Sequence, residues 1–167
     1  RSDGGALLIG EQYYVEEQVY RDFITNTFRY EYIYYYNDII VVNIQPTGEI
    51  EWATRIPKRQ ITRNDGGYYS SYAHAIVRDK IYLIFNDNYR NFNSSNRTRL
   101  YNYNGRESIV ALAEISIDGQ WTLAPLFPNR EAEIVTRPKV SRQTGRKEMI
   151  LFGELGRSFR LGKLEFE

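Results

Sequence analysis

The apolar residues of this chain fall into short runs, and they do not keep the period of a helix over any long stretch. The runs are rich in β-branched and aromatic residues, and Gly, Asn, Asp and Pro separate them. Such runs between turn-forming residues are typical of β-strands. In the middle of the chain they predict strands over residues 72–77, 80–86, 108–117 and 120–127. We therefore expect an all-β protein.

Parts of the chain resemble one another when they are shifted by about 70 positions. Residues 39–52 align with residues 110–123, and both segments consist of a strand, a turn with glycine and a second strand. A second pattern, that of a strand buried on both faces, is shared by residues 7–11, 82–86 and 149–153. Strands of this kind need neighbours on both sides, as the blades of a propeller have. We therefore expect a propeller-like array of four-stranded antiparallel blades.

The repeat accounts for fewer than three blades. It gives a partial blade at about residues 5–56, a full blade at about 70–127 and a partial blade at about 134–167. Propellers typically close with about four to eight blades. We therefore interpret the chain as a partial propeller and as the C-terminal part of a longer protein, the rest of which it would contact. Two alternatives stay open: the same hairpins can form a small barrel or sandwich, or several copies can assemble into a ring.

Composition and charge exclude several classes of function. The 22 basic residues nearly balance the 21 acidic ones, so the chain lacks the strong positive field of a nucleic-acid-binding protein. We therefore expect no nucleic acid among its partners. No stretch of about 18 apolar residues occurs, so no transmembrane segment is expected. With no cysteine and one histidine, a metal would depend on oxygen ligands, and the segments around Asp65 and Asp87 lack the spaced acids of a calcium loop. We predict no metal site and no cofactor.

Six short motifs carry a resemblance to a known family. They are IGEQYY at 9–14, YYNDIIV at 35–41, IPKRQ at 56–60, NDGG and YSSY between 64 and 72, IFNDN at 84–88 and TRPKV at 136–140. As a set they resemble an uncharacterised family of exported β-propeller-like proteins from Bacteroidetes-type bacteria, over nearly the whole chain. The resemblance implies the C-terminal part of a longer chain and a location in the bacterial cell envelope, in the periplasm or at the cell surface. It implies no activity.

The segments between the strands hold the candidate binding residues. The repeat leaves two long insertions, residues 16–37 and 88–107, and a third segment, 57–69, which in a propeller emerge on the same face. They are rich in Tyr, Asn and Arg, which can stack on a ligand and bond to it. The candidates are Tyr30, Tyr32, Arg59, Arg63, Asp65, Tyr89, Arg90, Arg97, Arg99, Tyr101 and Tyr103. Two other interpretations remain: the loops pack on their own ring or on further blades, and the alternation at 30–34 marks an extra strand.

Catalytic groups are weakly indicated. His74 lies in a predicted strand, and no nucleophile-elbow pattern accompanies it. Glu11, Asp87 and Glu154 fall near the ends of three equivalent strands, where two of them could act as the paired carboxylates of a glycosidase or lyase. Their equivalence in the repeat also explains them as polar residues at blade ends. The sequence therefore favours a non-enzymatic binding or scaffold module that contacts a protein or glycan through its loops, with a carbohydrate-active enzyme as the alternative.

Overall fold

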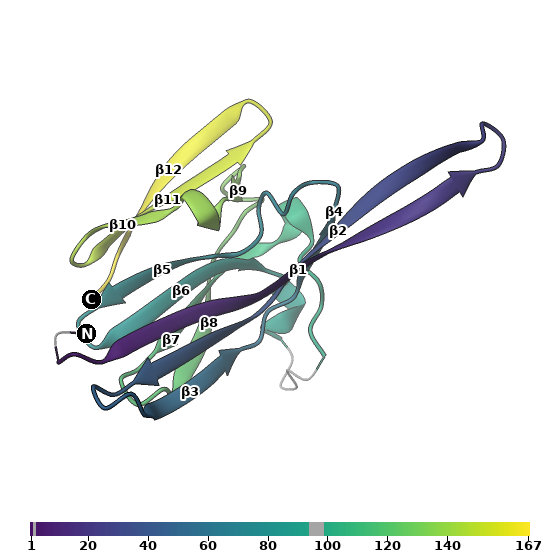
Figure 1. The fold of residues 1–167 in the computed structure, drawn as a ribbon. Coiled ribbons are helices and arrows are strands. Elements are labelled where there is room, and N and C mark those ends of the chain that lie inside the picture. Colours follow the sequence, from purple (N-terminus) through teal and green to yellow (C-terminus); the bar gives the residue numbers. More distant parts are fainter. Residues whose placement is uncertain (2, 94–98) are drawn as a thin grey trace.

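The computed structural model describes residues 1, 3–93 and 99–167, and these form an all-β fold of three antiparallel sheets with four strands each (Figure 1). The first sheet contains β1 (Ala6–Asp22), β2 (Thr27–Ile44), β3 (Ile50–Ile56) and β4 (Gln60–Arg63). The central sheet contains β5 (Tyr72–Val77), β6 (Lys80–Asp87), β7 (Ile109–Ile115) and β8 (Trp121–Pro128). The C-terminal sheet contains β9 (Val135–Thr136), β10 (Arg142–Gly145), β11 (Glu148–Leu155) and β12 (Ser158–Glu165). Three short 3-10 helices complete the described part: η1 (Tyr89–Asn91), η2 (Gly105–Glu107) and η3 (Pro138–Val140).

The central sheet confirms the four strands predicted for the middle of the chain. Its strands pair in the order β5-β6-β7-β8, each antiparallel to the next. Arg78 adopts a φ of 55° in the turn between β5 and β6. Such a tight turn joins strands that follow each other directly in the chain, which is why runs of residues separated by short turns could be assigned correctly.

The central sheet is covered on both faces, which explains its near-continuous apolar strands. On one face, Leu83 and Phe85 of β6 belong to a core with Ile39 and Val41 of the first sheet. On the other face, Ile84 belongs to a second core with buried residues of the C-terminal sheet, including Met149 and Leu151. Since successive residues of a strand point to opposite faces, β6 needs apolar residues at nearly every position, and seven of its eight residues are buried.

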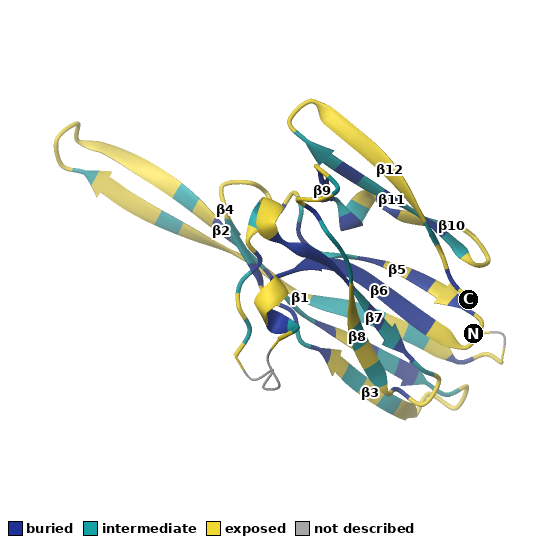
Figure 2. Cartoon of the chain, turned by 180° about the vertical axis from the view of Figure 1, so that it is seen from behind, coloured by how far each residue is buried: buried dark blue, intermediate teal, exposed yellow. Residues whose placement is uncertain are grey.

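Residues 16–37 form strands, so the expectation of a long loop there is wrong. β1 and β2 pair continuously from Ala6 and Ile44 to Asp22 and Thr27, with one irregularity between Glu11 and Tyr13. Beyond the body of the first sheet they continue as a two-stranded ribbon that projects from the molecule (Figure 1). We call residues 15–34 the arm. Figure 2 shows that most of the arm is exposed. The alternation of aromatic residues at 28–34 favours a strand over a loop. The structure thus agrees with the alternative interpretation of the sequence, an extra strand at 30–34.

The described residues form three sheets and show no closed barrel or propeller. The same part of the chain contains no helix with the length and apolar character needed to cross a membrane.

Candidate binding surface at the base of the arm

Segments that lie far apart in the sequence meet at the base of the arm. The side chain of Asn102 accepts a hydrogen bond from the backbone N–H of Ile61 (2.8 Å) and donates one to the carbonyl of the same residue (2.9 Å). The backbone N–H of Tyr103 donates to the carbonyl of Arg59 (3.0 Å). On the other side of β4, the side-chain oxygen of Asn64 accepts from the backbone N–H of Tyr32 in the arm (2.8 Å). The loop after β3, the loop after β6 and the arm therefore form one surface.

A buried lysine lies beneath this surface. The ammonium group of Lys58 donates to Glu11 Oε1 (2.6 Å), to the carbonyl of Tyr36 (2.7 Å) and to Gln60 Oε1 (2.9 Å). The Lys58 side chain is fully buried, and that of Glu11 is nearly so. Burial lowers the pKa of Lys58 from 10.5 to about 8, because loss of water disfavours the charged form, and the Glu11 carboxylate limits the decrease. Three donors therefore meet three acceptors in the interior.

The hydrogen-bond network continues from this lysine into the other two sheets. Gln60 donates through Nε2 to the carbonyl of Asn86 in β6 (2.7 Å). Asn129 donates to the Asn86 side-chain oxygen (2.8 Å) and accepts from the backbone N–H of Thr136 in β9 (2.8 Å). A satisfied network of buried polar groups fixes the relative positions of the elements that it connects. The binding surface therefore rests on a rigid layer.

A polar pocket with a volume of about 280 Å³ opens beside the buried lysine. Its polar lining includes Gln12, Asn37, Asp38, Arg55, Arg59 and Arg99. Arg55 forms an ion pair with Asp38 (3.5 Å), whereas Arg59 and Arg99 have no ion pair with any residue that the structure describes. The side-chain oxygen of Asn37 is buried and lacks a hydrogen-bond partner among the same residues. Within the described part of the chain, the pocket therefore offers two guanidinium groups without an ion pair and one acceptor without a donor.

Several predicted binding residues lie on this surface with exposed side chains. Arg59 and Arg99 line the polar pocket. Tyr101, two residues after Arg99, is exposed, and the guanidinium carbon of Arg90 lies 5.3 Å from the centre of its ring. Tyr89, in η1, is also exposed. These five residues form the accessible part of the candidate site.

The remaining predicted residues have other surroundings. Tyr30 and Tyr32 are exposed on the arm, and Arg63 forms an ion pair with Glu31 at its base (2.9 Å). Asp65 shapes the turn after β4, because its carboxylate accepts from Thr62 Oγ1 (2.6 Å) and from the backbone N–H of Gly67 (2.8 Å). The ring of Tyr103 is buried, and burial raises the pKa of its hydroxyl. Arg97 lies outside the described residues.

Arg59 and Arg99 are the predicted binding residues that line the pocket; other residues of its lining, among them Asn37, Arg55 and Lys58, were not predicted. Lys58 and Arg59 follow each other in the sequence, yet one is buried and the other exposed. Arg55 belongs to β3 and comes near the pocket only through the pairing of β3 with β2. The irregular pairing of β1 and β2 next to Gln12 also shapes the site, and the sequence gives no signal for it.

The three carboxylates considered for catalysis each have partners of their own. Glu11 binds Lys58. Asp87 accepts from Asn91 Nδ2 (2.7 Å), and Glu154 forms an ion pair with Arg137 (3.0 Å). None of the three lines the polar pocket. The convergence of acids in an open pocket that would support a glycosidase is therefore not found in the described part of the chain.

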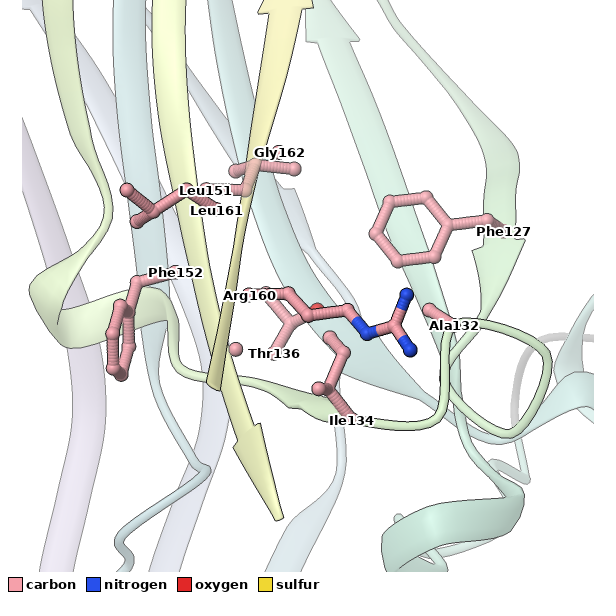
Figure 3. Close-up of a pocket in the computed structure, with 10 residues that line it drawn as sticks. Phe127, Ala132, Ile134, Thr136, Leu151, Phe152, Arg160, Leu161 and Gly162 are labelled. Carbon is pink, nitrogen blue, oxygen red and sulfur yellow. The ribbon is translucent and has the colours of Figure 1, made fainter. Parts of the chain in front are cut away.

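Other candidate groups are separate from the surface. His74 is exposed on β5, with its ring centre 6.5 Å from that of Tyr72. Among the described residues, no cluster of three or more His, Cys, Asp or Glu side chains that could hold a metal is found. A second pocket of about 150 Å³ lies between the central and C-terminal sheets, where Phe127, Ile134 and Leu151 give it an apolar lining (Figure 3).

No family model, no curated protein and no solved structure matches this chain. Its function must therefore be argued from the geometry of the surface at the base of the arm.

Proposed function

We propose that this chain is a non-enzymatic binding module that holds an acidic sugar residue of a glycan in the polar pocket at the base of the arm. The observation that carries the proposal is that Arg59 and Arg99 lie in one pocket, neither of them ion-paired with a residue that the structure describes. Guanidinium groups bind carboxylate and sulfate oxygens through pairs of charge-assisted hydrogen bonds. An acidic group is therefore the chemistry that this pocket fits best.

The uncharged features of the site favour a sugar as the carrier of that acid. The buried oxygen of Asn37 lacks a donor among the described residues, and a sugar hydroxyl can supply one. Tyr101 is exposed beside Leu100, which lines the pocket, and presents a ring to a neighbouring sugar.

The experiment compares binding to an array of neutral, carboxylated and sulfated glycans. We expect the wild-type chain to prefer acidic glycans and the double variant Arg59→Gln/Arg99→Gln to lose at least about tenfold in affinity, because each lost charge-assisted bond is worth on the order of 2 kcal/mol. Arg63→Gln is the matched control, since Arg63 is exposed but paired with Glu31. Equal binding of acidic and neutral glycans, or equal losses in the double variant and the control, would contradict the proposal.

A protein partner is the second candidate for the same surface. Tyr89, Arg90 and Tyr101 are exposed together, with the Arg90 guanidinium near the Tyr101 ring. Tyr and Arg are enriched among the residues that dominate binding at protein interfaces. In that case the Tyr101→Ala substitution would weaken binding to the protein partner. The Arg59→Gln/Arg99→Gln substitution would not change binding to any glycan.

We further propose that the three sheets are consecutive blades of a propeller-like array in an exported protein of the bacterial envelope. Support comes from the central sheet, which has a sheet packed on each face, and from β1, β6 and β11, which contain the three segments of the predicted repeat. The envelope location is supported by the family resemblance of the sequence motifs alone. An experimental structure of the full gene product without further stacked sheets, or the protein in the cytoplasmic fraction of its host, would overturn these two proposals.

A further inference from the structure

The end of the arm carries the two most exposed large apolar side chains of the described residues. Phe23 is 85% exposed and Ile24 is 96% exposed, and both lie in the turn between β1 and β2. Figure 1 shows this turn as the point farthest along the arm from the body of the molecule. Two side chains of this size in full contact with water are costly. Contact with an apolar environment would therefore stabilise these two side chains.

The residue types change in a regular order from the turn toward the body. Behind Phe23 and Ile24, the paired positions are Arg21 with Phe28 and Tyr20 with Arg29. The carboxylates of the arm other than Asp22 lie nearer its base, at positions 16, 17 and 31. From the tip to the base, the arm thus has apolar residues, then aromatic and basic residues, then acids. This order matches the hydrocarbon, headgroup and water layers at the surface of a bilayer.

We propose that the tip of the arm, residues 20–30, inserts its apolar turn into the surface of a lipid bilayer and that its arginines contact anionic headgroups. This proposal is independent of the proposed glycan site, which lies at the opposite end of the arm. Within residues 20–30 the charged groups are Arg21, Asp22 and Arg29, so the tip has a net positive charge. Basic residues near a membrane surface are attracted by anionic lipids.

Asp22 fits this arrangement because its carboxylate holds the shape of the turn. It accepts hydrogen bonds from the backbone N–H groups of Ile24 (2.9 Å) and Thr25 (3.2 Å). These two donors lower the pKa of Asp22, so the group stays charged and bound to the turn. The guanidinium of Arg21 is held by Asn26 Oδ1 (2.7 Å) and lies 5.7 Å from the centre of the Phe23 ring. The tip therefore has a defined conformation with its apolar side chains outermost.

The shape of the tip favours a bilayer over a protein partner. A specific protein interface generally buries at least about 1,000 Å², and a ribbon of two strands ending in a four-residue turn, 23–26, offers little flat surface. A bilayer interface needs only a few apolar side chains at shallow depth, about 5–10 Å. Face-to-face pairing of two arms is the other way to cover Phe28 and Tyr30, and the experiment separates the two.

The experiment measures binding of the intact chain to vesicles of phosphatidylcholine and to vesicles of phosphatidylcholine mixed with phosphatidylglycerol. We expect co-sedimentation with the mixed vesicles and at least a tenfold loss of partitioning in Phe23→Ser/Ile24→Ser. The matched control is Phe159→Ser/Leu161→Ser on β12, which removes two side chains that are each 66% exposed away from the arm. This control and the pocket variant Arg59→Gln/Arg99→Gln should bind vesicles as the wild type does.

A fluorescent variant reports insertion directly. In Phe23→Trp, the added indole should shift its emission to shorter wavelength with mixed vesicles, beyond the background of Trp52 and Trp121 in the wild type. Three outcomes would overturn the proposal: wild-type chain that does not bind either vesicle, tip and control variants that lose binding equally, or a concentration-dependent dimer that the tip substitutions abolish while vesicle binding stays absent. Circular dichroism of both double variants checks that they fold.

Discussion

At the residue scale, Lys58 places an ammonium group in the interior of the protein, where its side chain is fully buried. A buried charge is costly unless it is paired and its donors are satisfied. Glu11 supplies the opposite charge, and the carbonyl of Tyr36 and the amide of Gln60 supply the other two acceptors. Since the loss of water still lowers the pKa of Lys58 to about 8, the pair makes stability depend on pH in a defined direction.

We expect the free energy of unfolding to rise between about pH 8 and pH 10 because of this lysine. Its pKa is 10.5 in the unfolded chain and about 8 in the folded chain, so between these values the unfolded chain binds more protons than the folded chain. The contribution is present at high pH and is lost as the pH falls through 8. Its size is on the order of 2 kcal/mol at pH 10. Urea denaturation at a series of pH values measures it.

The control for the pH series is the Lys58→Met variant, which lacks the titrating group. The difference in unfolding free energy between wild type and variant should change with pH, and parallel curves would show that Lys58 titrates normally. The series ends near pH 10 because tyrosines oppose the effect above that value. Burial raises the pKa of Tyr103, and a tyrosine with a raised pKa loses its stabilising contribution once the unfolded chain ionises at about pH 10.

At the scale of the elements, the loop after β6 is held to β4 by one side chain. The side-chain amide of Asn102 is hydrogen-bonded to the backbone N–H and to the carbonyl of Ile61. It thus makes the two hydrogen bonds that a neighbouring strand would make at this edge of the first sheet. The segment after it also bonds through the Tyr103 backbone to Arg59. Arg99 therefore depends on Asn102 for its position beside the pocket.

We expect Asn102→Ala to cost about 1–3 kcal/mol of stability, because it leaves the N–H and carbonyl of Ile61 without partners. Amide hydrogen exchange should become faster at Ile61 and Tyr103 and stay unchanged in β6 and β7. Asn104→Ala is the matched control, since Asn104 is exposed and its side chain makes no cap hydrogen bond to η2. Equal exchange rates in the two variants would mean that the loop is held by something other than Asn102.

The elements also show where sequence patterns are sufficient. Strands such as β5 to β8 were predictable, because a run of β-branched and aromatic residues bounded by turn-forming residues is a local signal. The arm was predicted only in part: residues 28–34 alternate clearly, whereas residues 15–22 mix charged and apolar side chains. A ribbon that has no sheet on either face needs no regular pattern of burial, so its sequence does not differ clearly from that of a loop.

At the scale of the whole molecule, the predictable part of the site was its residue types and the unpredictable part was its geometry. Arg59, Arg99 and Tyr101 were candidates because their segments lie between strands. The pairing of Lys58 with Glu11, and the contribution of Asn37 to the pocket, depend on how β1, β2 and the loop after β3 meet in space. Contacts between segments far apart in the chain carry no local periodicity, so one sequence alone does not indicate them.

Two polar contacts help to attach the C-terminal part of the chain to the other two sheets. The Gln143 amide accepts from the backbone N–H of Ile76 (3.0 Å) and donates to its carbonyl (3.0 Å), which joins β10 to β5. Lys139 donates to Tyr36 Oη (2.7 Å) and to the carbonyl of Gly67 (3.1 Å), which joins η3 to the first sheet and its following loop. The attachment also includes the buried polar network that reaches Thr136 of β9 and the apolar core around Met149 and Leu151.

We expect Gln143→Ala to loosen the C-terminal sheet as a unit without unfolding the other two. The substitution leaves both backbone groups of Ile76 without side-chain partners, and stability in proteins varies between cooperative regions of a structure. Hydrogen exchange of the paired amides of β11 and β12 should therefore become faster together, while that of β6 and β7 stays near the wild-type rate. Thr144→Ala is the control, because among the described residues the Thr144 hydroxyl bonds within its own sheet, to Glu148 (2.9 Å). If β6 and β7 exchange faster to the same extent as β11 and β12, the three sheets unfold as one body, and the buried network from Lys58 to Thr136 then couples them more strongly than the edge contacts do.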